Sequence, residues 1–147
     1  MKGLTLWQPW ASLMGQGKHH ETRSWSTKYR GPIAIHAALK KPFINDLTKQ
    51  TRTFIKDNLG EDWISDLPLG AIISIAYLTD CKRVEMIDTD PIDRLLGNYN
   101  EGRWAWEFSN IIILSKPFPI RGHHKLWNIP SEIENKLLRQ YKLNQQN

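Results

Sequence analysis

The segment Leu69-Gly70-Ala71-Ile72-Ile73-Ser74-Ile75-Ala76-Tyr77-Leu78 is a continuous apolar run that is rich in β-branched residues and follows Pro68. An apolar run of this length, bounded by proline and glycine, is typical of a buried strand. We therefore expect residues 69–78 to form a central strand, around which the other elements of the chain are arranged.

Shorter strands are predicted on both sides of this run. Residues 3–7 and 33–37 have the patterns of strands, and residues 104–114 place three aromatic side chains on one face. A last short strand is expected at Pro119-Ile120-Arg121. Residues 85–93 are acidic and contain a proline, which favours a loop or a short helix over the surface.

Helices are predicted between these strands and at the C-terminal end. Pro9 suits the first turn of a short helix that Gly15 and Gly17 end. Ser131 and Glu134 form a capping-box pattern that opens a helix over about residues 131–142, before a frayed tail at 143–147. One or two amphipathic helices are expected between residues 41 and 64, where apolar residues recur at helical spacing: Phe43, Leu47, Phe54, Ile55 and Leu59.

The order of these elements favours one fold class. Several short strands interrupted by helices, with no repeated strand–helix rhythm, are typical of an α+β fold built on a small barrel. The 147 residues can close one core of this size and are too few for two. We therefore expect a single domain over residues 1–147.

Composition narrows the choice of partner. The chain has 20 Lys and Arg against 15 Asp and Glu, a formal net charge of +5, and seven tryptophans. A basic balance favours polyanions such as nucleic acid, and a tryptophan is either buried or held at a surface that binds a flat group. Because Trp7, Trp63 and Trp127 lie among aliphatic neighbours, we expect these three in the core.

Cysteine usage and the first residues predict where the protein is found. The lone Cys81 excludes an intrachain disulfide and a cysteine-rich zinc site. The opening residues lack the apolar run of a signal peptide, and no stretch approaches the length that crosses a membrane. We expect a cytoplasmic protein with no membrane partner.

The segment Gly17-Lys18-His19-His20-Glu21-Thr22-Arg23 places charges of both signs at short intervals after a glycine. Glu21 and Arg23 would share one face of a strand, and Lys18 would come from the preceding turn. There Glu21 could orient Lys18 or accept from a base amine, while Arg23 binds a phosphate or a carbonyl. The alternative is a solvated surface network of ion pairs.

Other candidates for contact with nucleic acid lie outside this segment. Gln8 can read the edge of a base and Trp10 can stack on one, although helix entry and core packing would also explain both residues. Arg30, Arg103 and Arg121 each stand beside glycine, where the backbone can approach a phosphate closely. Scattered lysines, among them Lys28, Lys40, Lys41, Lys116 and Lys125, could extend a basic rim or form an ordinary solvated face.

Five histidines raise the question of a metal. His19-His20 and His123-His124 are adjacent pairs, so each pair could give at most one ligand from a regular strand. No His-x-His or His-Glu-x-x-His spacing occurs, and we assign no metal ligand. His36 is expected to be a hydrogen-bonded histidine at a strand end, with a general-base role as the alternative.

Blocks along nearly the whole chain resemble one family. Leu6-Trp7-Gln8-Pro9-Trp10-Ala11, Gly17-Lys18 with Glu21-Thr22-Arg23, and Tyr29-Arg30-Gly31 leading into Ile35-His36-Ala37 resemble the ASCH domain. Gly102-Arg103-Trp104-Ala105-Trp106 and Arg121-Gly122 with Leu126-Trp127 resemble its closing strands. The resemblance implies a PUA-like β-barrel, with a cleft that the Gly-Lys-x-x-Glu-x-Arg segment helps to line.

The resemblance implies a function as well. Most members are described as modules that bind RNA or other nucleic acid, which favours recognition of a single strand or a flipped base by Gln8, Trp10, Lys18, Glu21 and Arg23, with Arg30, Arg103 and Arg121. Some members are hydrolases, either ribonucleases or an amidohydrolase of acylated cytidine. In an enzyme Lys18 and Glu21 would be catalytic, with Tyr29 or His36 as proton partner.

The match to the amidohydrolase is incomplete. That enzyme uses a lysine and a threonine three residues later, and this chain has Lys18 followed by Glu21 at that position. No cofactor is implied, apart from a divalent metal if the protein is a nuclease. A modified nucleoside is a further possible ligand, and an adaptor that binds an unknown protein through the C-terminal helix is the third alternative.

Overall fold

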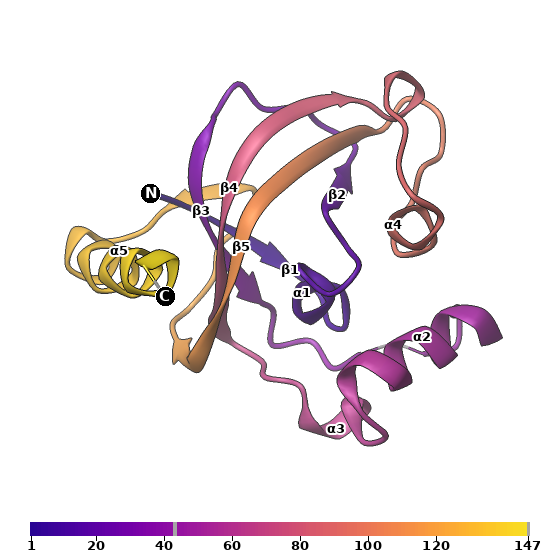
Figure 1. The fold of residues 1–147 in the computed structure, drawn as a ribbon, viewed down its shortest axis with the longest axis horizontal. Helices are drawn as coiled ribbons and strands as arrows, with labels where there is room; N and C mark the ends of the chain where they lie inside the picture. Colours follow the sequence, from indigo (N-terminus) through magenta and orange to yellow (C-terminus); the bar gives the residue numbers. More distant parts are fainter. Residues whose placement is uncertain (43, 147) are drawn as a thin grey trace.

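The computed structural model describes residues 1–42 and 44–146, with side chains described through Lys142. The predictions for Phe43 and for Asn147 lie outside the described residues. Six strands of the described chain form one curved sheet in the order β2-β5-β4-β3-β1-β6 (Figure 1). The strands are β1 (Lys2–Leu6), β2 (His20–Arg23), β3 (Gly31–Ala37), β4 (Ala71–Arg83), β5 (Trp104–Pro119) and β6 (Leu126–Asn128).

The sheet is mixed but mainly antiparallel. β1 and β3 run parallel, whereas every other pair of neighbouring strands is antiparallel. β4 lies inside the sheet between β3 and β5, which confirms the predicted central strand for residues 71–78; the strand begins at Ala71 rather than at Leu69. Register shifts interrupt the pairing of β4 with β5 at three places, and such bulges bend the strands. The result is a half-barrel, and the predicted α+β class is confirmed.

Helices of the described chain lie on both sides of this half-barrel. In Figure 1, α5 lies on one side and α1 to α4 lie toward the other. A 3₁₀ turn at Val84–Met86 and α4 occupy the segment that the sequence assigned to a loop or short helix. The helices are α1 (Trp10–Leu13), α2 (Lys49–Leu59), α3 (Trp63–Asp66), α4 (Pro91–Leu95) and α5 (Ser131–Gln146).

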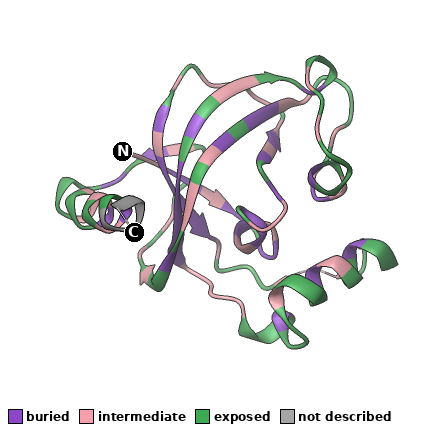
Figure 2. Ribbon diagram, viewed as in Figure 1, coloured by how far each residue is buried: buried purple, intermediate pink, exposed green. Residues whose placement is uncertain are grey.

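Alternation along the strands divides the core into two clusters. Ile33 and Ile35 of β3 pack with Leu4, Leu6 and Ala11 of α1 on the concave side of the sheet. Ala34, between them, points to the other side, where Leu137 and Tyr141 of α5 cover it. Figure 2 shows the buried segments concentrated in the middle of the strands.

The curvature of the sheet brings β2 near β1, although the two strands are not hydrogen-bonded neighbours. Arg23 of β2 donates from Nη2 to the backbone oxygen of Thr5 in β1 at 2.9 Å. β6 pairs with β1 only from Lys2 to Leu4, so the Thr5 oxygen lies beyond the end of that pairing. A side chain therefore bridges the open side of the half-barrel.

Two expected boundaries differ from the structure. The strand predicted at residues 119–121 is wrong, because Pro119 ends β5 and the next strand begins at Leu126. Gly122 packs so close to His36 and Thr5 that a Cβ on it would lie 2.6 Å from both, so this segment forms a loop against β1 and β3. Helix α5 reaches Gln146, beyond the end expected near residue 142.

Candidate nucleic-acid interface

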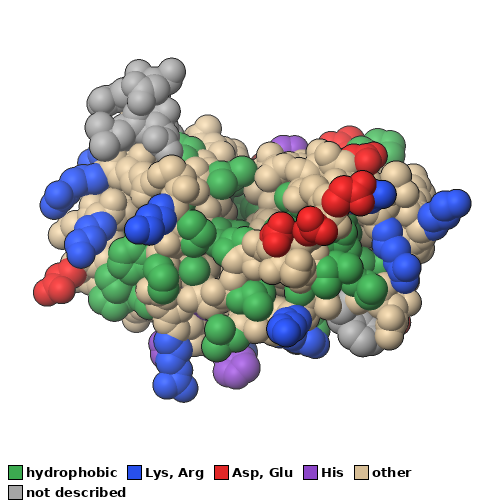
Figure 3. Space-filling model, turned by 90° about the horizontal axis from the view of Figure 1, so that it is seen from below, with side chains coloured by type: hydrophobic (Ala, Val, Ile, Leu, Met, Phe, Trp, Pro, Cys, Tyr) green, Lys and Arg blue, Asp and Glu red, His purple; other side chains and the backbone are tan. Residues whose placement is uncertain are grey.

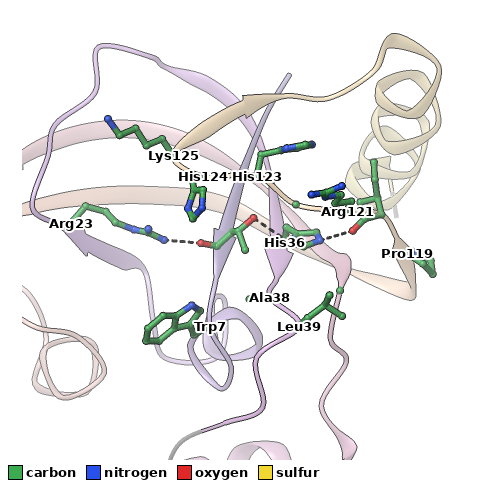
Figure 4. A pocket seen from close by; sticks show the side chains of 14 residues that line it. Trp7, Arg23, His36, Ala38, Leu39, Pro119, Arg121, His123, His124 and Lys125 are labelled. Atoms are coloured by element: carbon green, nitrogen blue, oxygen red, sulfur yellow. Dashed lines mark hydrogen bonds between the residues drawn. The ribbon is translucent and has the colours of Figure 1, made fainter.

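A cavity of about 1210 Å³ opens between the ends of β1 and β3 and the loop of residues 119–125. We call it the β1–β3 pocket. Figure 4 shows Arg23 and Trp7 on one side of this space, Arg121 on the other, and His36 between them. These side chains come from four separate segments of the chain, so only the curved sheet and the loop bring them together.

Trp7 supplies the aromatic surface of the pocket. Its side chain is 58% exposed, and the Nζ atom of Lys40 lies 3.5 Å from the centre of its ring. A cation over an indole face is attracted by the ring electrons. The prediction that Trp7 belongs to the core is wrong: Leu4 and Leu6 fill the inner face of β1, and the next side chain points away from it.

Trp7 and Trp10 have the opposite roles to those predicted from the sequence. Trp10, which the sequence placed in the binding site, packs instead against the cluster that Leu13, Ile55 and Trp63 form beneath α1 and is absent from the lining of the β1–β3 pocket. Trp63 and Trp127 are buried, as predicted. The aromatic wall is therefore the residue at the end of the first strand rather than the residue at the start of the helix.

Positive charge surrounds the pocket. Arg121 and Lys125 are exposed in the loop after β5, Arg23 faces them from β2, and Lys40 stands over Trp7. No Asp or Glu occurs among the described residues that line the cavity. On the face of the molecule that Figure 3 shows, the basic side chains are dispersed instead. The β1–β3 pocket thus combines one exposed indole with cations, which suits a flat, anionic ligand.

Gln8 is not among the residues that line the pocket, and its side chain is engaged in hydrogen bonds within the fold. Its Nε2 donates to Ser12 Oγ at 2.8 Å and to the backbone oxygen of Pro68 at 2.9 Å, and its Oε1 accepts from the backbone N–H of Ser12 at 3.0 Å. The side chain is 2% exposed. Both amide hydrogens that would read a base are therefore used to join α1 to the segment before β4.

Lys18, Glu21 and Arg23 are brought together, as the sequence predicted, in a row that runs from the buried Lys18 to the partly exposed Arg23. Lys18 Nζ donates to the backbone oxygen of Leu96 at 2.9 Å and lies 3.4 Å from Glu21 Oε1. Glu21 Oε2 in turn accepts from Arg23 Nη2 at 3.1 Å. Of these three side chains, only that of Arg23 lines the β1–β3 pocket.

The burial of this row decides what each member can do. The Lys18 side chain is 1% exposed, and the Glu21 side chain is 14% exposed. The buried ammonium of Lys18 thus has a carboxylate and a carbonyl oxygen as partners, which offset the cost of burying its charge. Lys18 and Glu21 therefore hold Arg23 from behind, whereas the guanidinium of Arg23 is the member of the row that a ligand can reach.

The remaining predicted residues lie outside the pocket. Arg30 is exposed, donates to the backbone oxygens of Thr27 and Tyr29, and lies 3.6 Å from Asp80. Arg103 donates to the backbone oxygen of Thr22 at 2.9 Å. The hydroxyl of Tyr29 donates to the backbone oxygen of Pro32 at 2.6 Å, and burial raises its pKa. The structure does not bring these three residues together with Arg23 and Arg121.

His36 lies on the floor of the pocket, bound at both ring nitrogens. Nε2 lies 2.7 Å from the backbone oxygen of Ile120, and Nδ1 lies 3.2 Å from Thr5 Oγ1. Burial lowers the pKa of His36; the bond to Ile120 acts in the opposite direction without reversing the shift. The prediction of a hydrogen-bonded histidine at the end of a strand is confirmed.

A second buried polar group was not predicted from the sequence. Asp93 of α4 accepts from the backbone N–H groups of His19 and His20, and its Oδ2 lies 2.6 Å from His20 Nδ1. Burial by itself would raise the pKa of Asp93, but the hydrogen bonds from His20 and His19 outweigh it and hold the pKa below its usual value. From the sequence, residues 85–93 were recognisable only as an acidic surface segment. No local pattern predicted that Asp93 would bond His19 and His20.

The described residues lack two features that other functions would use. Within residues 1–42 and 44–146, no three His, Cys, Asp or Glu side chains are grouped as metal ligands. No helix in the same part of the chain is long and apolar enough to cross a membrane.

Comparison with known proteins gives a consistent picture. The sequence model of the ASCH domain matches residues 4–118 of this chain. Activating signal cointegrator 1 from Homo sapiens is 29% identical over 132 residues, which cover 88% of this chain and 22% of that protein. The protein of the same name from Mus musculus is 28% identical over 132 residues, with the same coverage. This chain therefore spans about a fifth of the length of these relatives.

The match ends inside the pocket. The matched residues include Thr5, Trp7, Arg23 and His36, whereas the loop of residues 119–125 follows the last matched position. One wall of the β1–β3 pocket thus lies in the part that the domain model describes, and the basic loop that forms the other wall lies beyond it.

Proposed function

This chain belongs to the ASCH domain family, and on that premise we propose that it is a nucleic-acid-binding module that takes an unpaired nucleotide, of RNA or of another single strand, in the β1–β3 pocket. One observation carries the proposal: the exposed indole of Trp7 and a set of cations surround one cavity that has no carboxylate among its described lining residues.

The indole of Trp7 accounts for binding of the base of the nucleotide. Proteins that bind single strands stack bases on aromatic side chains, because every base has a flat face. A base inside a duplex offers no such face to a side chain. The half-exposed ring of Trp7 therefore favours an unpaired or flipped nucleotide, with Lys40 moving aside or remaining on the opposite face.

The cations account for binding of the phosphate backbone of the nucleic acid. Arg23, Arg121 and Lys125 surround the cavity from two sides, and such side chains bind phosphates without regard to sequence. Among the partners that the sequence suggested, RNA or another single strand therefore fits this pocket best. A modified nucleoside that carries a flat base remains an alternative ligand of the same cavity.

The buried residues of the motif support binding indirectly in this proposal. Arg23 contacts the nucleic acid, and Lys18 and Glu21 fix the position of its guanidinium through the distances of 3.4 and 3.1 Å described above. Gln8 and Trp10 shape the fold under Trp7, and Arg30 and Arg103 contribute only long-range positive charge.

The test is fluorescence anisotropy with a short single-stranded RNA, the same sequence as a duplex, and the corresponding single-stranded DNA, each over a series of salt concentrations. We expect the single strands to bind more tightly than the duplex, and binding to weaken steeply as salt rises. Preference for the duplex, or binding that salt does not weaken, would contradict the proposal.

A matched pair of variants assigns the binding to this pocket. Arg121→Gln and Arg30→Gln each remove one exposed arginine, but only Arg121 lines the cavity. We expect the first to lower the affinity about 5-fold or more, and the second to change it less than about 2-fold. Equal losses would place the interface elsewhere on the surface.

The two other functions considered from the sequence receive less support. A hydrolase that uses Lys18 and Glu21 would need them to touch a substrate, and the Lys18 side chain is 1% exposed. An adaptor that binds through α5 would need an apolar face free on that helix, yet Leu137 and Tyr141 are buried against the sheet. Truncation after Pro130 that left RNA binding intact but abolished a protein contact would favour the adaptor.

A further inference from the structure

A hydroxyl and an imidazole are paired on the floor of the β1–β3 pocket. Thr5 Oγ1 lies 3.2 Å from His36 Nδ1, and both residues line the cavity. The third partner is the backbone oxygen of Ile120, 2.7 Å from His36 Nε2. Figure 4 shows the three groups joined in one row of hydrogen bonds. Neither Thr5 nor this row is explained by binding to nucleic acid.

The carbonyl of Ile120 decides which ring nitrogen carries the proton. A carbonyl oxygen only accepts hydrogen bonds, so His36 Nε2 must carry its hydrogen. In the neutral ring Nδ1 is then the acceptor, and the hydrogen between Thr5 and His36 belongs to the hydroxyl. Because burial lowers the pKa of His36, the ring stays neutral near neutral pH. This is the arrangement of a nucleophile, its base and a group that orients the base.

Gly122 packs directly against the pair, with its backbone in contact with both residues. A Cβ at this position would lie 2.6 Å from the Thr5 hydroxyl oxygen and 2.6 Å from atoms of the His36 ring. The backbone of Gly122 is not in the left-handed region, so its conformation alone does not require glycine. Glycine is required here because any side chain would collide with both members of the pair.

We propose that Thr5 and His36 form a nucleophile–base pair that hydrolyses carboxylic esters of flat, anionic molecules in the β1–β3 pocket. The proposal goes beyond nucleic-acid binding and does not depend on it. It also assigns the chemistry to residues other than Lys18 and Glu21.

The reaction has two steps. Thr5 Oγ1 attacks the ester carbonyl carbon while its proton passes to His36 Nδ1, the bond from carbon to the alcohol oxygen breaks, and that proton passes to the departing alcohol. Water then attacks the acyl-threonine carbonyl, His36 takes one proton from it, and the threonine oxygen leaves with that proton. The products are the alcohol and the carboxylic acid, and Thr5 and His36 return to their first state.

The pocket sets the class of ester. Trp7 presents a flat apolar surface, and Arg23 and Arg121 stand on either side of the pair. Arg23 donates to the backbone oxygen of Thr5 at 2.9 Å, so its guanidinium lies near the residue that carries the nucleophile. Positive charge at this point stabilises the oxyanion that forms there. An aromatic ester with a carboxylate on its acyl group fits these features.

The experiment uses the full chain with 4-nitrophenyl succinate, a flat ester that carries one carboxylate, and with the neutral 4-nitrophenyl acetate. We expect the wild type to hydrolyse the anionic ester at least about 10-fold faster than the neutral one, as judged by kcat/KM, since binding energy from the arginines is used in the transition state. Mass spectrometry after a short reaction should find one succinyl group on the peptide that contains Thr5.

Three variants make the result decisive. Thr5→Val removes the hydroxyl at nearly constant volume and should lower kcat/KM by about 100-fold or more, whereas Thr5→Ser should keep activity within about 10-fold. Thr79→Val removes an exposed threonine hydroxyl that bonds Glu107 and should change nothing. His36→Gln should abolish the acyl adduct. If that variant fails to fold, the comparison of Thr5→Val with Thr5→Ser still tests the proposal.

Two results would overturn the proposal: undiminished hydrolysis by a folded Thr5→Val protein, or a succinyl group found only on lysines. The wild type is tested for RNA binding in a separate experiment. Ester hydrolysis without RNA binding would refute the proposed function alone, and RNA binding without hydrolysis would refute this inference alone.

Discussion

The two walls of the β1–β3 pocket carry charges in opposite ways. On the β2 side, Lys18 is buried and Glu21 is largely buried, and these two residues are connected to the pocket through Arg23. On the other side, Arg121 and Lys125 stand in an exposed loop. A row of charges with a regular spacing in sequence can therefore belong to the fold, while an irregular loop presents its charges to solvent at the pocket.

The largest expected effect is the loss of stability when the buried ammonium of Lys18 is removed. Lys18→Met removes the ammonium that bonds Leu96 and Glu21. Because the carboxylate and the carbonyl lose a buried partner, we expect the free energy of unfolding to fall by about 3 kcal/mol and the melting temperature by about 10 °C. Urea and thermal unfolding, followed by circular dichroism, measure both quantities.

The matched control for this variant is Lys56→Met. Lys56 also pairs with a glutamate, Glu61, but its side chain is 52% exposed. Exposed pairs contribute little, so the change should stay within about 0.5 kcal/mol. Equal losses of stability in the two lysine variants would show that burial does not distinguish the Lys18–Glu21 pair from an exposed ion pair.

A second expected effect tests the support beneath Trp7. Gln8→Leu removes two donors and one acceptor and leaves the backbone oxygen of Pro68 without its partner. Burying such a group unpaired should lower the free energy of unfolding by about 2 kcal/mol. Chemical denaturation measures the change. A stable variant that had lost RNA binding would show instead that Gln8 reads the base directly.

The third prediction separates binding from stability at the exposed indole of Trp7. Trp7→Ala deletes an indole that is 58% exposed, so the free energy of unfolding should change by less than about 1 kcal/mol. Loss of the stacking surface should weaken binding of single-stranded RNA by about 1–3 kcal/mol, or about 5- to 150-fold. Anisotropy and thermal melts on the same preparation test both expectations. A large loss of stability with unchanged binding would contradict them.

The fourth prediction concerns the loss of stability at acidic pH. Since burial lowers the pKa of His36 in the folded chain, the unfolded chain binds the proton first as the pH falls. The contribution of His36 is complete above its unfolded pKa, about 6.5, and declines as the pH falls through and below it. Urea midpoints at pH 7.5 and 5.5 should therefore differ in the wild type, and they should differ less in His36→Gln. An equal acid effect in both proteins would assign it to other groups.

The smallest expected effect concerns the salt dependence of binding, and it distinguishes Arg121 of the loop from Glu21 of β2. Arg121→Gln should flatten the plot of log affinity against log salt by about one unit, because one fewer phosphate is neutralised. Glu21→Gln should leave that slope unchanged, since Glu21 contacts Lys18 and Arg23 rather than the ligand. Slopes that changed equally would place both residues at the nucleic acid.

The strands and helices were largely predictable because their signals are local. The apolar run around Ile72 and Ile75 predicted the central strand β4, and the capping-box pattern at Ser131 predicted the start of α5. The strand expected at Pro119-Ile120-Arg121 failed for a reason outside the segment. Gly122 is held against His36 and Thr5, which are far away in sequence, and this contact makes the segment a loop.

The candidate site was predictable only in part. The sequence indicated that Lys18, Glu21 and Arg23 belong together, and the contacts among them confirm this. It assigned Trp10 to the site and Trp7 to the core, whereas the structure places Trp7 at the pocket and packs Trp10 beneath α1. The exposure of one tryptophan depends on what covers it, and that is set by elements many residues away.

The sequence by itself determined the kinds of element, the α+β class, the excess of positive charge and the family to which the chain belongs. Periodicity, turn residues and charge are properties of neighbouring residues, so they can be read along the chain. Only the tertiary structure decided that Lys18 is buried, that Trp7 is exposed and that Thr5 meets His36. These facts depend on the curvature of the sheet and on the loop of residues 119–125, which bring distant segments into contact.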